Sequence, residues 1–242
     1  MPANDAYADS PMLAAEDLMF IRKDLQDRLR QGTGDFLPFA VVFAGPWSGS
    51  IFEHLAATKA YLDLRTGDDF HVYFAGLSQV SPPSEGFRVP DDRGRNRDAG
   101  GRFTTVRWNP GLFDRMRRDV AIESSQTDVG HVSSPWHFSG NSDLLLLRAM
   151  EGDGSLATID WSSMLSLDLT RFDGDAGRPW FGQLVELIMR QIESDADDEQ
   201  LDRWITEVLG SDQSVPNGLH HWLGSIGVGV ATRAAAQVIG LG

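Results

Sequence analysis

Hydrophobic residues occur along this chain in two patterns, continuous runs and helical stripes. Phe39 to Ala44 is a continuous apolar run with two valines, which predicts a strand buried on both faces. Residues 69–77, DFHVYFAGL, are β-branched and aromatic and predict a second buried strand. Between them, residues 50–64 carry apolar positions at imperfect helical spacing. A strand, a helix and a strand in this order predict a βαβ unit with two parallel strands.

The middle of the chain combines a long polar segment with a clear helix start. Residues 82–102 are rich in Pro, Gly, Arg and Asp and predict a long loop. Asn109 followed by Pro110 is a cap and a proline at the first helical position. We therefore expect a crossover helix after Asn109, with three apolar side chains pointing inward: Leu112, Phe113 and Met116.

The next segment predicts an antiparallel hairpin and a closing helix. Residues 143–150, DLLLLRAM, form an apolar strand, and Glu151 to Gly154 is a turn signal. Residues 156–169 continue as one long or broken strand. Pro179 opens a helix whose apolar stripe contains Phe181, Leu184, Val185, Ile188, Met189 and Ile192.

The two ends of the chain predict further helices around this core. We expect Met1 to Ser10 to be disordered and one amphipathic helix to follow, with its apolar stripe running from Leu13 to Leu29. Helices are also expected at residues 201–209 and 219–239. The predicted organisation is a tail and helix in residues 1–35, an α/β domain in 36–195 and a two-helix extension in 196–242.

Composition limits the chemistry. The chain of 242 residues contains no cysteine, which excludes disulfides, thiolate metal sites and dithiol redox chemistry. The net charge is −14, so we do not expect nucleic acid binding. Nine arginines nevertheless lie between Glu85 and Arg118, against five acidic residues, which predicts a solvated loop or a contact with an anionic ligand or acidic partner. No secretory signal is visible, and we expect a cytoplasmic protein.

The order β-α-β-α-β-β-α, together with the stretch VFAGPWSGSIF, resembles the thioredoxin-like superfamily. Trp47 and Gly49 match the Trp and Gly of the family's active-site turn. Ser48 and Ile51 stand where the two cysteines of that family would be, and Ser50 replaces the proline between them. The family places a cis-proline before its third strand, where this chain has Asn141-Ser142-Asp143.

The resemblance implies an α/β, thioredoxin-like core with an N-terminal helix and a C-terminal helical extension, but without the family's activity. Thiol exchange needs an attacking and a resolving thiol, and a serine supplies neither. The resemblance therefore implies a non-redox binding or regulatory module that needs no cofactor, metal or catalytic residue. Its expected partner is a protein, or a second copy of the chain through the C-terminal helix. The candidate contact residues are Trp47, Ser48, Ser50, Trp136, Asn141, Asp143, Arg95 and Arg97.

Other interpretations remain open at this point. Ser48 or Ser50 at a helix N-terminus would be a hydrolase or transferase nucleophile with oxyanion donors nearby, or simply a helix cap. The histidine pairs His131/His137 and His220/His221 lack the i,i+4 spacing typical of helical metal sites. Trp136 is expected to be a buried cover for the sheet edge. The glycine- and alanine-rich C-terminus predicts a helix packed on the domain or at an oligomer interface, with a membrane-active tail as the alternative.

Overall fold

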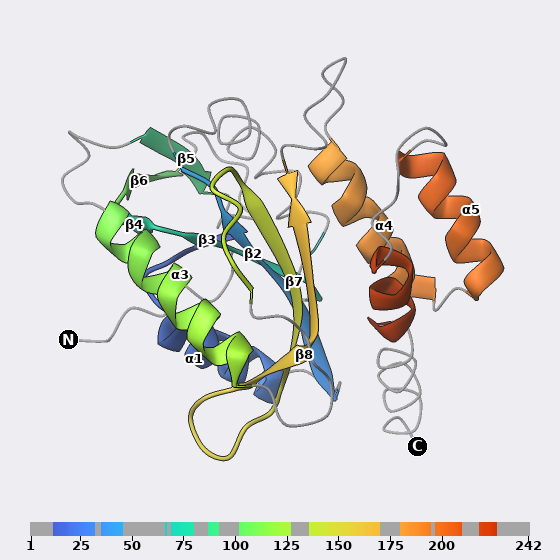
Figure 1. The fold of residues 1–242 in the computed structure, drawn as a ribbon, viewed down its shortest axis with the longest axis horizontal. Helices are drawn as coiled ribbons and strands as arrows, with labels where there is room; N and C mark the ends of the chain where they lie inside the picture. Colours follow the sequence, from blue (N-terminus) through green and yellow to red (C-terminus); the bar gives the residue numbers. More distant parts are fainter. Residues whose placement is uncertain are drawn as a thin grey trace.

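The structure is a computed structural model of the chain, and it describes ten segments (Figure 1). Three sequence predictions lie outside these segments: disorder in Met1 to Ser10, the helix at residues 50–64 and the last helix beyond residue 226. The described residues are 12–31, 35–45, 66, 69–79, 87–91, 102–126, 136–169, 180–194, 197–209 and 218–226.

A mixed five-stranded sheet forms the centre of the α/β fold, with the strand order β1-β3-β2-β7-β8. The first three of these strands are parallel. Strand β7 is antiparallel to β2, and β8 is antiparallel to β7. The strands are β1 Met12–Ala15, β3 His71–Ala75, β2 Phe36–Phe43, β7 Asp143–Met150 and β8 Thr158–Asp168.

The hydrophobic pattern predicted four of these strands. In β2, every side chain from Leu37 to Phe43 is buried, as the continuous apolar run requires. The parallel pairing of β2 with β3 and the antiparallel β7–β8 hairpin are both confirmed. Of the two alternatives left open for the second hairpin strand, the structure shows one long strand, β8, with a register shift between Leu146 and Arg148 of β7.

The prediction of an N-terminal helix with Leu13 on its stripe is wrong at its start. Residues Met12–Ala15 form β1, which pairs in parallel with β3, and helix α1 spans Leu18–Gln31. The helix begins later because Asp17 caps it: the Phe20 backbone N–H donates to the Asp17 carboxylate at 2.8 Å. Leu13 fits the helical spacing of the apolar residues from Leu18 to Leu29 only by coincidence.

The prediction of one long loop over residues 82–102 is also wrong in part. Strands β4 Leu77–Gln79, β5 Phe87–Asp91 and β6 Arg102–Trp108 form a second, antiparallel sheet in the order β4-β6-β5. Pro90 argues against a strand at the level of sequence, because proline has no backbone N–H to donate to the hydrogen-bond ladder of a sheet. It is accommodated because β5 lies at the edge of this small sheet.

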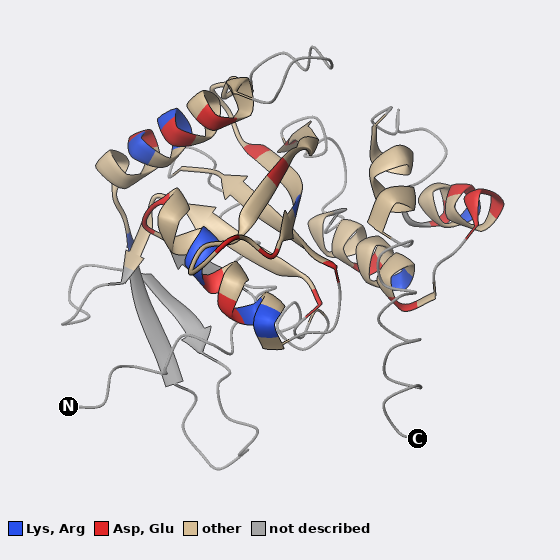
Figure 2. Cartoon of the chain, turned by 90° about the horizontal axis from the view of Figure 1, so that it is seen from below, with Lys and Arg blue, Asp and Glu red and all other residues tan. Residues whose placement is uncertain are grey.

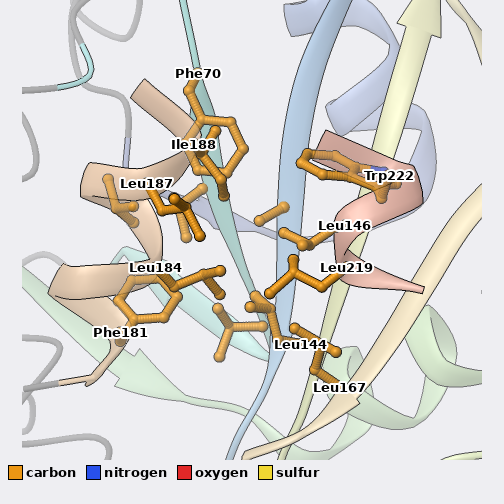
Figure 3. Packing of buried hydrophobic residues seen from close by; sticks show 14 of the residues in the cluster. Phe70, Leu144, Leu146, Leu167, Phe181, Leu184, Leu187, Ile188, Leu219 and Trp222 are labelled. Atoms are coloured by element: carbon orange, nitrogen blue, oxygen red, sulfur yellow. The ribbon is translucent and has the colours of Figure 1, made fainter. Parts of the chain in front are cut away.

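Helices cover both faces of the central sheet (Figure 1). Alternate residues of β7 point to opposite faces, so Leu145 and Leu147 pack with α1 and α3, whereas Leu144 and Leu146 pack with α4. Figure 3 shows this second cluster, to which Leu219 and Trp222 of the helix at residues 219–226 belong. The remaining helices are α3 Pro110–Ser125, α4 Trp180–Ser194 and α5 Asp198–Leu209.

The predicted helix stripes agree closely with the packing. All six apolar residues predicted for α4 are buried. In α3, Asn109 caps the helix, and Phe113 and Met116 are buried, although Leu112 is only half-buried. Leu201 of α5 and Leu219 join the same cluster as the sheet, so the described part of the C-terminal segment packs on the domain.

Charged residues recur along the helices (Figure 2). On α1, Asp24 accepts hydrogen bonds from Arg28 at 2.8 Å and from the buried Tyr73 hydroxyl at 2.6 Å. Arg22 of α1 also pairs with Glu123 of α3, which ties the two helices on this face together. These bonds fix α1 against β3 and α3, and so help to position the sheet edge near α3.

Gly76, between β3 and β4, is a position where a side chain should not fit. Its φ is +81°, and an added Cβ would lie 2.8 Å from Phe113 Cβ and 3.2 Å from Trp108 Nε1. Its carbonyl accepts the Asn109 backbone N–H at 2.7 Å, which holds the start of α3 close. A side chain at position 76 would therefore suffer both a clash with Phe113 and the strain of a positive φ.

We predict that Gly76→Ala lowers the free energy of unfolding by about 2–4 kcal/mol. Gly154→Ala is the matched control, because Gly154 has φ +109° and nothing within 4 Å of its added Cβ, so it incurs backbone strain alone. Urea unfolding measures both variants. Equal losses in the two variants would show that the contact with α3 is not a constraint.

Candidate functional site

The end of the sheet where β2 stops and β7 begins brings together several distant parts of the chain. Phe43, the last residue of β2, lies directly opposite Asp143, the first residue of β7. Residues 136–142 lead into β7 at this point. The carboxyl ends of the parallel strands meet at this same edge, where open α/β sheets place their ligands.

Five aromatic side chains pack together here, and we call them the aromatic cluster. Its centre is Phe43, whose ring centroid lies 4.6 Å from that of Trp136 and 5.8 Å from that of Phe113. Trp136 is buried, as predicted for a cover of the sheet edge. Phe138 lies 5.3 Å from Phe113, and Trp108 lies 5.9 Å from it. The aromatic cluster thus forms one apolar base, to which strand β2, the start of α3 and the segment before β7 all contribute.

Asp143 places a carboxyl group beside this apolar base. The residue is only 2% exposed. Its Oδ2 accepts the backbone N–H of Ser139 at 2.9 Å. Its Oδ1 is buried without a hydrogen-bond partner among the residues that the structure describes, and so is the indole N–H of Trp136. A buried carboxyl with one unpaired oxygen is costly, and such groups concentrate at functional sites.

The surroundings of Asp143 disfavour its charged form. Burial raises the pKa of the Asp143 carboxyl above its ordinary value, and interactions with Ser139 offset only part of this rise. Asp168, directly opposite on β8, raises the pKa further because two carboxylates repel each other. The Trp136 indole favours the charged form slightly, although it makes no hydrogen bond of regular geometry.

Residues 137–141, which we call the tip segment, form a polar surface above the aromatic cluster. His137, Ser139, Gly140 and Asn141 are exposed, and Phe138 is half-buried. The Asn141 backbone N–H donates to Ser139 Oγ at 3.2 Å, and Gly140 adopts φ +92°. The site therefore combines an exposed polar tip with a buried aromatic and acidic base.

Both ends of the tip segment are attached to the core. The Trp136 backbone N–H donates to Ser124 Oγ of α3 at 3.3 Å. On the other side, the Leu169 backbone N–H donates to the Ser142 carbonyl at 2.7 Å. These bonds fix the positions between which the tip segment runs.

The structure brings together three of the predicted contact residues. Trp136 and Asp143 lie in the buried base, and Asn141 lies in the exposed tip segment. The other five predicted residues lie outside the described segments: Trp47, Ser48, Ser50, Arg95 and Arg97. Sequence reasoning did not assign Phe43, Phe138 or Asp168 to a site. Asp168 could have been found by pairing the ends of the predicted hairpin, but Phe138 carried no distinguishing signal.

Metal binding and membrane insertion receive no positive support from the described segments. No group of three or more histidine, aspartate or glutamate side chains within them could hold a metal ion. His137 is exposed, and His220 lies 3.3 Å from the Asp202 carboxylate; His131 lies outside the described residues. The helices of the described ranges all fall short of the length and apolar character needed to cross a bilayer.

Comparison with known proteins gives no family. No protein-family model, curated protein or solved structure matches the chain. A function must therefore be argued from the geometry of the sheet edge and from the residues that the chain carries there.

Asp160 on the same hairpin offers an electrostatic contrast with Asp143. Burial alone would raise the pKa of Asp160, but hydrogen bonds from Ser162 and from Arg148, at 2.7 Å, outweigh it and hold the pKa below its ordinary value. Ionised Asp160 therefore stabilises the fold above its ordinary pKa, and this contribution disappears as the pH falls through the lowered value. For Asp143 the sign is opposite: its contribution is present at low pH and disappears as the pH rises through the raised value.

We predict that Asp143→Asn and Asp160→Asn change stability with opposite pH dependence. Relative to the unmodified chain, the free energy of unfolding of Asp143→Asn should rise by about 1 kcal/mol as the pH increases from about 4 to about 7, because the variant avoids burying a charge. Asp160→Asn should lower the free energy of unfolding by about 2 kcal/mol near pH 7, and by less in acid. Urea unfolding across this pH range measures both effects. Parallel pH profiles of the two variants would contradict the electrostatic assignment.

Proposed function

We propose that this protein is a non-catalytic binding or regulatory module on a thioredoxin-like scaffold, and that it recognises a protein segment at the carboxyl edge of its parallel strands. One observation carries the proposal: the exposed tip segment lies over the buried aromatic cluster and Asp143 at that edge. An exposed polar segment that carries a half-buried aromatic ring, Phe138, is typical of surfaces that bind proteins.

The strand arrangement supports the scaffold. Strands β2 and β3 are parallel, α3 crosses to the antiparallel β7–β8 hairpin, and α4 closes the unit. These elements follow the order on which the resemblance to the thioredoxin-like superfamily rests, with β4, β5 and β6 inserted between β3 and α3. The proposal also includes a first crossover helix at residues 50–64, which only the sequence pattern supports.

The absence of cysteine supports a module without redox activity. A chain with no cysteine has no thiol to form or exchange a disulfide. The edge that a thiol oxidoreductase would use for chemistry instead presents the hydrogen-bonding groups of Asn141 and Ser139. Folds are often reused in this way, with a new function grafted onto the same scaffold.

The contact surface in this proposal is larger than the tip segment. Trp47, Ser48 and Ser50 follow the end of β2 in the sequence, and Arg95 and Arg97 lie in the arginine-rich window. These five residues are included on the sequence alone. Trp136 and Asp143 form the base of the surface, and Asn141 is its exposed polar contact.

We predict that peptides selected from a random display library for binding to the folded chain shift the amide NMR signals of residues 136–143. Asn141→Arg should weaken their binding at least tenfold, because it places a bulky charge in the exposed tip segment. Thr158→Arg is the matched control, since Thr158 is exposed at the far end of the hairpin, opposite Met150. Selected peptides that perturb other residues, or that tolerate Asn141→Arg, would contradict the proposed surface.

We also predict that a serine-directed fluorophosphonate probe does not label the folded chain. The proposal assigns Ser48 and Ser50 to contact or capping, not to nucleophilic attack, so no activated hydroxyl should react with the probe. Gel fluorescence and intact mass spectrometry after incubation measure the labelling. Labelling that Ser48→Ala or Ser50→Ala removes would overturn the non-catalytic assignment and favour a hydrolase or transferase.

A further inference from the structure

The tip segment is hydrogen-bonded to Asp143, a buried carboxyl that is only partly paired among the described residues. The backbone N–H of Ser139 donates to Asp143 Oδ2, while Oδ1 stays buried with no hydrogen-bond partner in the described part of the chain. The Asp143 carboxyl is therefore out of water, with one oxygen bonded to the tip segment and the other unpaired among the described residues. An incompletely paired charge of this kind is expensive to bury.

We propose that the tip segment is a charge-sensitive latch over the aromatic cluster, closed while Asp143 is protonated and loosened when Asp143 is ionised. The latch deepens the proposed function, on which it rests for its biological use, because it would regulate exposure of the same surface. Its opening can nevertheless be measured with no partner present.

Thermodynamic linkage fixes the direction of the effect. If the closed segment binds the Asp143 proton more tightly than an open, hydrated segment does, ionisation must favour the open state by the same factor. The bond to Ser139 opposes opening, but burial is the larger influence on the Asp143 carboxyl. Opening then returns both carboxylate oxygens to water.

Of the groups that face Asp143, Asp168 adds to this tendency, whereas Ser139 and the Trp136 indole oppose it. Asp168 lies directly opposite on β8, and its negative charge disfavours ionisation of Asp143 in the closed state. Strand β2 presents the uncharged Phe43. Phe113 of α3 packs against Phe138 of the tip segment, whose titratable side chain is the exposed His137.

The backbone of the segment has the parts that a local movement needs. Gly140 has φ +92°, and no atom lies within 4 Å of the position of an added Cβ, so the turn has open space around it. Trp136 and Ser142 are bonded to α3 and to Leu169, on either side. Movement of the residues between these points would uncover Phe138, which packs 6.4 Å from Phe43 and is only half-buried.

The latch can be tested by hydrogen–deuterium exchange mass spectrometry on the intact chain between about pH 4 and pH 7. Labelling times are scaled to the intrinsic exchange rate at each pH, and peptides covering residues 137–142 and 144–149 are compared. Protection of the first peptide should fall as the pH rises, about tenfold for each unit by which the closed segment raises the pKa of Asp143. Protection of the second peptide, from the core of β7, should not follow this trend.

Two variants assign the effect to Asp143. Asp143→Asn should give a tip segment with high and pH-independent protection, whereas His137→Gln should retain the dependence of the unmodified chain. A flat or rising profile in the unmodified chain would overturn the latch, as would the same slope in Asp143→Asn. If protection falls with pH but no peptide binds at this edge, the latch stands and the proposed function is wrong. If peptides bind at this edge but protection does not change with pH, the proposed function stands and the latch is wrong.

Discussion

Strand β2 is the constraint on which the rest of the structure depends. It is parallel to β3 on one side and antiparallel to β7 on the other, and its residues from Leu37 to Phe43 are buried. A strand buried on both faces needs helices on both sides of the sheet, and α1 and α3 cover one face while α4 covers the other. The reversal of direction at β2 is also what places its last residue opposite the first residue of β7.

This juxtaposition creates a site with opposing energetic demands. Phe43 gathers rings from α3 and from the segment before β7 into a well-packed aromatic cluster. The same register places the Asp143 carboxyl beside that cluster and opposite Asp168. Among the described residues one oxygen of this carboxyl has no hydrogen-bond partner, and an apolar residue of similar size would fill the position at lower cost. The cost is understandable if the tip segment above Asp143 must open or bind.

The sequence predicted local features well, because these are determined by nearby residues. The stripe from Phe181 to Ile192 was correct at every position, and the Asn109-Pro110 pair marked the start of α3. Leu13 was misassigned because β1 is defined by its pairing with β3, some 60 residues away, and not by its own spacing. Pro90 concealed β5 because only its position at a sheet edge makes a proline acceptable there.

The candidate site was predictable only in part, for the same reason. Asn141 and Asp143 were selected because they occupy the cis-proline position in the thioredoxin-like resemblance, and Trp136 was selected as a buried cover of the sheet edge; the structure places all three at the start of β7. The pairing of Asp143 with Phe43 depends on the register between β2 and β7, which no local pattern reveals, whereas the predicted hairpin already contained the pairing with Asp168. The raised pKa of Asp143 follows mainly from its burial, which depends on tertiary packing and could not be read from the sequence.

Site-specific titration of the aspartate side chains by carbon-13 NMR tests this account most directly. In the folded chain, the Asp143 carboxyl should titrate above the ordinary aspartate pKa of 3.8, and the Asp160 carboxyl should titrate below it. An Asp143 that titrates at or below its ordinary value would show that its carboxyl is well solvated or fully paired, which would contradict the view of this sheet edge as a strained and functional site.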